Sequence, residues 1–159
     1  GGVALTNGIH MLDRIAWVCG QALRFHGCAA GSGFGLGDVE DTAAMQLSLV
    51  DGAPVSLLAA WLQGEGPMDD ELTIYGCNGT LRIWSWRGWR FEPTQGVAEE
   101  HASYNPNADL AARVRIGMAG ALTEFASAIL DQRPPSVTPG EILAAQEIVE
   151  QFYRHSSLK

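Results

Sequence analysis

The sequence has little positive charge. Its 159 residues include a single lysine, Lys159, and 10 basic residues stand against 18 acidic ones, giving a formal net charge of −8. A polyanion partner requires clustered lysine and arginine side chains. The nearest approach is residues 84–90, where three tryptophans are interleaved with two arginines. Two arginines in an acidic chain are a weak footprint, so we interpret this segment as a tryptophan-rich strand pair and expect no nucleic acid partner.

Long hydrophobic runs are also missing. No apolar stretch approaches the roughly 20 residues that a membrane span needs. The start, Gly1-Gly2-Val3-Ala4, has no positive region followed by an apolar stretch, as a signal peptide would. We therefore expect no membrane partner and a cytoplasmic location. The start is abrupt, which is expected of a piece cut from a longer chain.

Cysteine is scarce and unpaired by pattern. Cys19, Cys28 and Cys77 are odd in number, and no pair of them has metal-ligand spacing. No Cys/His cluster suggests a zinc site. We expect free, mostly buried thiols in a reducing compartment, and no bound metal.

Helical periodicity occurs at both ends of the chain. Ile9–Cys19 has an apolar stripe, with Asn7 as a plausible cap and Gly20 as a stop. A longer helix is predicted for Asp109–Leu130, ended by Arg133-Pro134-Pro135. Its apolar positions are spaced by threes and fours: Leu110, Val114, Met118, Leu122, Phe125 and Ile129. The segment Thr138-Pro139-Gly140-Glu141 has a capping-box pattern and starts a last helix that runs to about Arg154.

The middle of the chain is typical of hairpin-linked strands. Asp51-Gly52 and Asn78-Gly79 are turn pairs, and residues 94–107 are polar and predicted to be a long loop. The predicted strands are Leu23–Cys28, Thr42–Val50, Val55–Leu62, Glu71–Tyr75, Thr80–Trp84 and Trp89–Phe91. Segregated helices and strands indicate an α+β fold: one domain over residues 1–159, with an open, mostly antiparallel β-sheet and helices packed on one face.

A glycine-rich loop, Gly31–Gly37, does not fit a dinucleotide fingerprint. That fingerprint is Gly-x-Gly-x-x-Gly between a strand and a helix. The third glycine would fall at Leu36 or Asp38, and the loop precedes a strand. The chain has no Walker-type phosphate loop either, so we assign no cofactor-binding residues in it.

The start of the first helix contains a candidate site. His10 lies one turn into that helix after a glycine-containing loop, where an imidazole could hydrogen-bond or protonate a substrate oxygen. Asp13, three residues on, could orient the ring. The alternative is a structural histidine paired with Asp13, and spacing alone favours that alternative.

Several segments, in order, resemble one family. Gly1–Trp17 is similar to the Gly-Gly-x-x-x-Asp-x-Gly-x-His-x-x-Asp segment of the Gfo/Idh/MocA family (glucose–fructose oxidoreductase, inositol dehydrogenase and relatives). Val39–Ala43 resembles that family's Asp-Thr lead into a strand, and Leu72–Leu81 resembles its strand–Gly-x-x-Gly-Thr hairpin. Phe125–Pro135 and Ala144–Tyr153 resemble its two closing helices. The likeness spans nearly the whole chain.

The resemblance implies a two-domain parent enzyme. Proteins of this family bind NAD or NADP in an N-terminal Rossmann domain and transfer hydride to or from a hydroxyl-bearing carbon, often of a sugar or cyclitol. Their C-terminal domain, similar to that of dihydrodipicolinate reductase, helps to wall the active site, and one sheet face packs against a partner subunit. This chain has neither the nucleotide fingerprint nor the family's Glu-Lys-Pro motif. The resemblance therefore implies a C-terminal half whose Rossmann domain is not in this chain.

The resemblance also implies site residues. His10 matches the family's histidine near the reacting hydroxyl, and Asp13 matches a downstream aspartate that we take as structural support. Thr6 stands where the family often has an assisting aspartate. A threonine can hydrogen-bond a hydroxyl but cannot take its proton at neutral pH, so the family's full proton relay is not reproduced. Thr6, with Asn7 as a second choice, is expected to bind substrate.

The five tryptophans receive separate interpretations. Trp17 and Trp61 lie in apolar runs and are expected in the core. Trp84 and Trp86 share a strand face, and with Trp89 they favour a subunit interface. Core packing and ligand stacking stay open for these three.

Two functional hypotheses follow. The first is the substrate-binding and oligomerisation half of an NAD(P)-dependent dehydrogenase for a sugar, polyol or related hydroxylated small molecule. That half would form a homodimer or tetramer through its sheet face and, without its cofactor domain, would bind no cofactor and be inactive. The second is a stand-alone, non-catalytic dimerisation or ligand-binding domain.

Overall fold

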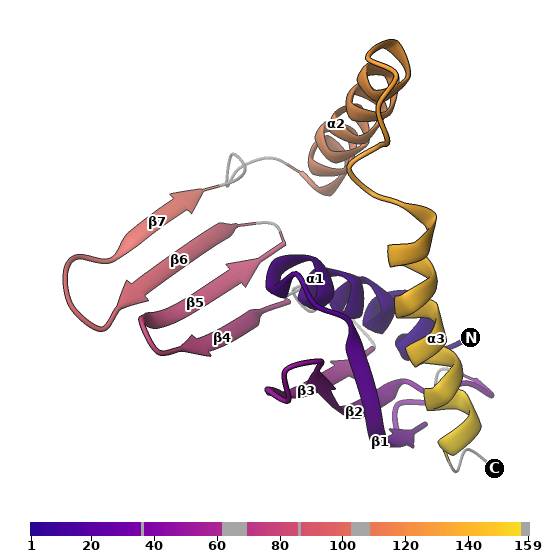
Figure 1. Ribbon diagram of the computed structural model, residues 1–159. Helices are drawn as coiled ribbons and strands as arrows, with labels where there is room; N and C mark the ends of the chain where they lie inside the picture. Colours follow the sequence, from indigo (N-terminus) through magenta and orange to yellow (C-terminus); the bar gives the residue numbers. More distant parts are fainter. Residues whose placement is uncertain (36, 62–69, 86, 103–108, 157–159) are drawn as a thin grey trace. The chain divides into compact units, whose positions relative to one another are not determined.

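The computed structural model describes residues 1–35, 37–61, 70–85, 87–102 and 109–156 (Figure 1). The chain divides into two compact units, Gly1–Gly66 with Val137–Lys159, and Pro67–Ser136. Each unit has its own antiparallel sheet, with strand order β1-β2-β3 in the first and β4-β5-β6-β7 in the second. The described strands therefore form two sheets, where the hairpin pattern predicts one.

The first unit begins with a short π-helical turn, η1 (Ala4–Gly8), which runs into α1 (Ile9–Cys19). Strands β1 (Leu23–Gly31), β2 (Thr42–Leu49) and β3 (Pro54–Ala60) follow, and α3 (Pro139–His155) completes the unit. The predicted stop at Gly20 is confirmed, because this residue has the left-handed φ of 62° that ends many helices. Leu62, the predicted end of the third strand, lies outside the described residues.

The core of the first unit lies between its sheet and its helices. Strand β2 alternates in burial, as its sequence predicts, and Figure 1 shows α3 running beside β1 and α1. One side of the core comes from the sheet: Ala43, Met45, Leu47, Leu49 and Leu57. The other side comes from the helical segments: Val3, Ala4, Leu12, Ile15, Ala145, Ile148, Val149 and Phe152.

The start of α3 confirms the predicted capping pattern. Thr138 is the N-cap residue and Pro139 occupies the first turn. The Glu141 carboxylate accepts hydrogen bonds from the Thr138 backbone N–H at 2.7 Å and from its hydroxyl at 2.8 Å. These bonds lower the pKa of Glu141, so the acid stabilises the helix start in its charged form.

The second unit contains β4 (Leu72–Gly76), β5 (Gly79–Trp84), β6 (Gly88–Pro93), β7 (Glu99–Ala102) and α2 (Leu110–Leu130). The pairing register separates two faces of its sheet. The apolar face has Leu72, Ile74, Leu81, Ile83, Trp89 and Phe91; the polar face has Thr73, Tyr75, Thr80, Arg82, Arg90 and Glu92. On the polar face, Arg90 pairs with Glu92 at 3.1 Å and with Glu100 at 3.6 Å.

Strand β7 corrects the prediction of an unbroken loop over residues 94–107. Residues 99–102 pair antiparallel with β6, and Trp89 stacks on the opposite His101 with ring centroids 6.2 Å apart. All four residues of β7 are exposed. A polar edge strand has no alternation of buried and exposed side chains, so its sequence does not reveal it. Residues 103–107 of the expected loop lie outside the described part of the chain.

Helix α2 matches its predicted span, and Asp109 caps it by accepting a hydrogen bond from the Ala112 N–H at 2.6 Å. Its predicted apolar stripe is exposed rather than buried at Val114, Met118, Leu122, Phe125 and Ile129. The periodicity is therefore real, but the second unit leaves this face uncovered.

The end of α2 is fixed by backbone and side-chain bonds together. Gln132 has a left-handed φ of 52°, which costs a non-glycine residue roughly 1–2 kcal/mol. The Gln132 N–H donates to the Ile129 carbonyl at 3.2 Å and the Arg133 N–H to the Ala128 carbonyl at 3.0 Å, which is the Schellman pattern. The helix stop predicted from Arg133-Pro134-Pro135 is therefore confirmed, with Gln132 as the turning residue.

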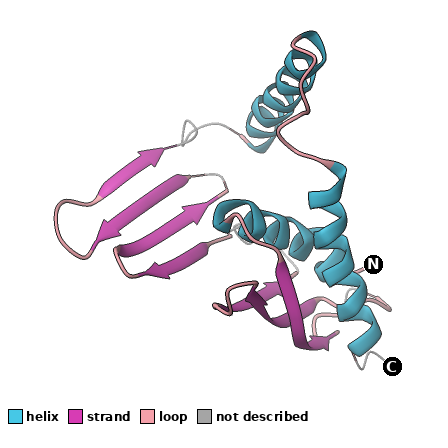
Figure 2. Cartoon of the chain, viewed as in Figure 1, coloured by secondary structure: helices cyan, strands magenta, loops and turns pink. Residues whose placement is uncertain are grey.

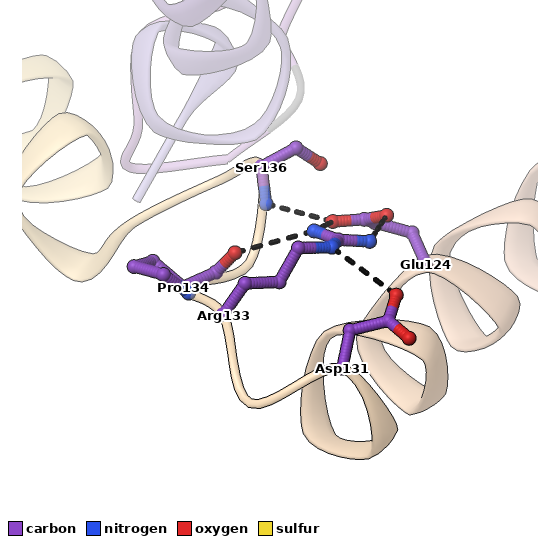
Figure 3. Close-up of polar contacts among 5 residues, drawn as sticks. All are labelled: Glu124, Asp131, Arg133, Pro134 and Ser136. Carbon is purple, nitrogen blue, oxygen red and sulfur yellow. Dashed lines mark hydrogen bonds and ion pairs between the residues drawn. The ribbon is translucent and has the colours of Figure 1, made fainter.

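A guanidinium–carboxylate pair supports this turn (Figure 3). Arg133 donates through both terminal nitrogens to the two oxygens of Glu124, each at 2.8 Å, and Asp131 lies 3.6 Å from its Nε. The Ser136 N–H donates to Glu124 at 2.8 Å. Hydrogen bonds from Arg133, and then from Ser136, lower the pKa of Glu124 from 4.5 to about 2. The ionised carboxylate thus holds the segment after α2 in place.

We expect Glu124→Gln to lower the melting temperature at neutral pH. The carboxyl has a depressed pKa in the folded state, so its contribution is present above 4.5 and is lost as pH falls through about 2. The difference from the unmodified chain, measured by circular dichroism melts across that range, should shrink as the solution becomes acidic. Glu150→Gln, in a single-contact pair with Arg154 at 3.0 Å, is the control and should show a smaller difference. An equal difference for both variants would contradict this role of Glu124.

Two antiparallel sheets and three α-helices in the described part of the chain confirm the α+β class (Figure 2). Cys19, Cys28 and Cys77 are free thiols, as expected, but the expectation that most of them are buried is wrong, because Cys19 and Cys28 are only half-buried. Cys77 is exposed, whereas burial raises the pKa of the Cys19 and Cys28 thiols.

Candidate functional site

The candidate site is built on a continuous helical segment. Gly8 has helical angles, φ −59° and ψ −40°, so η1 passes into α1 without a break. Asn7 therefore does not cap α1, and that prediction is wrong: its own backbone is already part of the preceding turn. π-Helical turns are rare and occur frequently at functional sites. Here the turn ends two residues before His10.

The predicted site residues share one exposed face. Thr6, His10 and Asp13 are spaced by four and three residues, and all three are exposed, as is Asn7. Four residues further along the same face, Trp17 is 71% exposed. The expectation that Trp17 belongs to the core is therefore wrong. Its apolar neighbours in sequence suggested burial, but the helix turns its indole away from Leu12 and Ile15.

Thr6 is held by its own turn. Its hydroxyl oxygen lies 3.0 Å from the Gly2 carbonyl oxygen and 2.9 Å from Asn7 Oδ1, both of which accept. The hydroxyl has one proton and donates it to one acceptor at a time, so its lone pairs stay available to accept a hydrogen bond from an incoming hydroxyl. The structure thus brings Thr6 and Asn7 together.

His10 and Asp13 project from α1 without a fixed bond between them. Within the described part of the chain, neither has a hydrogen bond or ion pair. The side chains can therefore be engaged by a ligand without breaking an internal contact.

A buried carboxylate anchors the start of this segment. Glu40 is 1% exposed and lies between the glycine-rich loop and β2. Its Oε1 accepts from the Ala4 N–H at 3.0 Å and from the Tyr153 hydroxyl at 2.7 Å, while its carbonyl oxygen accepts from the Val3 N–H at 3.0 Å. Residues from the start, the middle and the end of the sequence therefore meet at one side chain.

Gly2 and Tyr153 complete this buried cluster. A Cβ atom at Gly2 would collide with the backbone oxygen and the carboxylate of Glu40, so only glycine fits this close approach. The Gly2 N–H donates to the Tyr153 hydroxyl oxygen at 3.2 Å. Burial, and then the hydrogen bond to Glu40, raise the pKa of Tyr153 to about 12. The phenol therefore stays neutral and donates to the carboxylate.

A second buried acid lies next in sequence. Asp41 is 0% exposed. Its Oδ2 accepts from the Phe34 N–H at 2.6 Å, and its carbonyl oxygen accepts from the Trp61 N–H at 2.6 Å. The Trp61 side chain is 46% exposed, so its expected core position is also wrong. Its backbone is fixed while its ring faces outward.

The sequence did not single out Glu40, Asp41 or Tyr153 as cluster residues. Acidic side chains are almost never fully buried without partners, and those partners lie far away in the sequence. The sequence offered one indication: the acidic pair Glu40-Asp41 lies between a glycine-rich loop and a predicted strand. The need for glycine at position 2 is evident only from the structure.

The other tryptophans have polar or aromatic neighbours. Trp84 is half-buried; its Nε1 donates to Glu71 at 2.9 Å, and the Arg87 guanidinium lies 5.8 Å from its ring centroid. Trp86, predicted to share a face with Trp84, lies outside the described residues.

Among the residues that the structure describes, no group of three or more His, Cys, Asp or Glu side chains is arranged to hold a metal ion. No described helix combines the length and apolar character needed to cross a membrane.

Solved structures share this fold over nearly the whole chain. One is the aldose-aldose oxidoreductase from Caulobacter crescentus in complex with glycerol, 20% identical with a TM-score of 0.73 over 98% of this chain and 45% of that one. A second is an oxidoreductase from Agrobacterium radiobacter in complex with NAD+, L-tartaric acid and magnesium, 17% identical with a TM-score of 0.78 over 96% and 46%.

A third is the UDP-N-acetylglucosamine 3-dehydrogenase from Acidithiobacillus ferrooxidans, 15% identical with a TM-score of 0.75 over 97% of this chain and 47% of that one. The chain thus spans about half the length of these three structures, and it has the fold of the matching half of each oxidoreductase. A comparison with curated proteins gives no match.

Residues 1–82 match the family model of the GFO/IDH/MocA C-terminal domain. The chain therefore belongs to the Gfo/Idh/MocA family, as the resemblance of its motifs predicted.

We expect Tyr153→Phe to destabilise the first unit. The variant removes the donor to a buried carboxylate, a loss of about 1.5–3 kcal/mol for a hydrogen bond to a charged group. Urea unfolding followed by circular dichroism measures the change. Tyr75→Phe removes the same hydroxyl from a residue that is 81% exposed and should change the free energy of unfolding by less than about 0.5 kcal/mol. Equal effects would contradict a special role for the buried hydroxyl.

Proposed function

We propose that this chain is the substrate-binding and oligomerisation half of an NAD(P)-dependent oxidoreductase that acts on a sugar, polyol or related hydroxylated small molecule. The observation that carries the proposal is the exposed face of Thr6, His10 and Asp13 on a segment anchored by buried Glu40, in a chain of this family. The chain has no nucleotide fingerprint, so the remaining half of the parent protein would hold NAD or NADP.

The chemistry assigned to this half is proton handling at the substrate hydroxyl. When bound, the nicotinamide cofactor supplies or accepts the hydride, as the NAD+ complex of the Agrobacterium radiobacter relative supports. Oxidation of an alcohol also releases the hydroxyl proton. An imidazole is suited to take that proton, or to return it in the reverse direction, because histidine titrates near neutral pH. His10 would be the catalytic residue.

Thr6 would bind substrate rather than exchange protons. Its hydroxyl oxygen is held by the turn at 3.0 Å from the Gly2 carbonyl and can accept a hydrogen bond from substrate. Asn7 would contribute to the same substrate site, and Asp13 would support the His10 imidazole once substrate is bound. The free thiols support a cytoplasmic location.

We expect His10→Asn in the parent enzyme to lower kcat by about 10²–10⁴-fold, the usual contribution of a general acid or base. Steady-state kinetics with NAD+ or NADP+ measures the change. His26→Asn is the control, because His26 lies on β1 and bonds to Ser48 at 2.8 Å, away from the candidate site. Unchanged turnover in the His10 variant would contradict the proposal.

Self-association would use the apolar face of the second sheet. That face has six apolar side chains that are not fully buried, Trp89 among them at 37% exposure. A half-exposed apolar sheet face rimmed by charges is suited to a homodimer or a dimer of dimers. The chain alone would then associate but remain inactive.

We expect light scattering after size-exclusion chromatography to give a dimer or tetramer whose mass does not change with NADH. Phe91→Ser, on the apolar face, should shift the mass toward the monomer. Tyr75→Ser, on the opposite face, is the matched control and should keep the oligomer, and circular dichroism checks the fold of both. A monomer at every concentration would exclude the interface, and NADH binding would exclude the assignment of the cofactor to another half.

A further inference from the structure

Helix α2 has an apolar stripe that the chain leaves exposed. Val114, Met118, Leu122, Phe125 and Ile129 recur every three or four residues, so they share one side of the helix. Each of these side chains is between 45% and 65% exposed. Single apolar side chains on a surface are ordinary, but a continuous exposed stripe marks an interaction surface.

The sheet of the same unit has the complementary surface. None of the six side chains of its apolar face is buried, and Trp89 is 37% exposed. The apolar stripe of a helix and the apolar face of a sheet are the two layers that pack together in α+β proteins. Each surface is therefore of the kind that the other needs.

The two surfaces agree in length. At 1.5 Å per residue, the stripe spans about 22 Å from Val114 to Ile129. Strand β5 lies inside the sheet between β4 and β6, and its six residues span about 20 Å. A helix lying along the strands can therefore cover the face from end to end.

Charges of opposite sign border the two surfaces. Glu99 of β7 pairs with Phe91 of β6, so its side chain lies on the apolar face, at the edge strand of the sheet. Arg115 lies one turn before Met118 and borders the stripe of α2. Both charged residues are exposed. A helix packed on the sheet can thus bring a guanidinium to the carboxylate at the edge of the face.

The exposed area favours an exchange between two copies over a single contact. The five stripe side chains expose on the order of 500 Å², whereas a standard interface takes about 800 Å² from each partner. If each copy places its helix on the sheet of the other, both surfaces of both copies are used. The area from each partner then rises to on the order of 1,000 Å², and the assembly closes with two-fold symmetry.

We propose that a second copy of this chain covers both surfaces, with α2 of each copy packed on the second sheet of the other. The inference rests on the proposed function only for the use of the apolar sheet face in self-association. It adds what covers that face: the helix of the partner rather than the partner's sheet.

The first test is the dissociation constant of the dimer, measured by sedimentation equilibrium. Leu122→Ser should raise this constant at least tenfold, because the dimer loses an apolar side chain from both of its contacts. Ile116→Ser is the matched control. Ile116 is 56% exposed but lies two residues from both Val114 and Met118, on the other side of the helix, so its variant should keep the original constant.

Circular dichroism melts confirm that both variants fold. An unchanged dissociation constant in Leu122→Ser, or an equal increase in the two variants, would overturn the inference. The first of these outcomes is also the result expected if the missing half of the parent protein, and not a second copy, covered the stripe.

The second test is cross-linking, which identifies the surfaces in contact. The Cys77→Ser background removes the exposed native thiol. Leu81→Cys, on the inner strand β5, and Leu122→Cys are introduced together, and the chain is treated with a short bismaleimide. We expect a covalent dimer on a denaturing gel, with mass spectrometry of the digested product locating the bridge between the two engineered positions.

Three results of the cross-linking would overturn the inference. A bridge within one chain would mean that α2 closes on its own sheet. A covalent dimer of the Leu122→Cys variant without Leu81→Cys would mean that two α2 helices pair with each other. Absence of any bridge between the two engineered positions would mean that helix and sheet do not meet.

The outcomes separate this inference from the proposed function. Loss of the dimer in Phe91→Ser together with an unchanged dimer in Leu122→Ser would overturn only the helix exchange and would leave the sheet-face interface in place. A monomer at every concentration of the unmodified chain would overturn both.

Discussion

The fold of the first unit depends on satisfying one buried carboxylate. Glu40 is 1% exposed, and removing a charged carboxylate from water is costly unless hydrogen bonds replace the lost hydration. The Ala4 N–H and the Tyr153 hydroxyl donate these hydrogen bonds to the carboxylate, and the Val3 N–H donates to the Glu40 carbonyl oxygen. Each of them brings a distant part of the chain to the same point, so the position of the first helical segment follows from the requirements of this acid. Gly2 has no side chain because one would occupy the same space.

That constraint leads directly to the candidate site. With its start fixed at Glu40, η1 runs into α1 in a defined phase, burying Leu12 and Ile15 and leaving Thr6, His10 and Trp17 outside. The next residue, Asp41, is also a buried acid, and it accepts hydrogen bonds from the backbone N–H groups of Phe34 and Trp61 in the neighbouring loops. Two adjacent buried acids thus fix the backbone at the start of the candidate site and at the neighbouring loops.

The sequence predicted the positions of helices and strands better than the burial of their side chains. The spans of α1, α2 and β2 followed from periodicity, and turn chemistry placed the Asp51-Gly52 hairpin. Strand β7 was missed because its residues are polar, and the exposure of Trp17 and Trp61 was missed because hydrophobicity alone does not say which apolar residues have partners. The π-helical turn and the burial of Glu40 depend on contacts between distant segments, which local patterns do not encode. Motif order indicated the family that the match over residues 1–82 then showed.

The most direct test of the central claim is hydrogen exchange of the backbone amides of residues 3–10 in Gly2→Ala, compared with Gly8→Ala. A Cβ atom at Gly8 meets only ordinary contacts, the nearest at 3.6 Å, so this variant should retain protection in η1 and the start of α1. Gly2→Ala should lose protection there, because its methyl group would collide with the Glu40 carbonyl oxygen, which bonds Val3, and with the Glu40 carboxylate, which bonds Ala4. Equal protection in the two variants would contradict the claim that the buried acid positions the site.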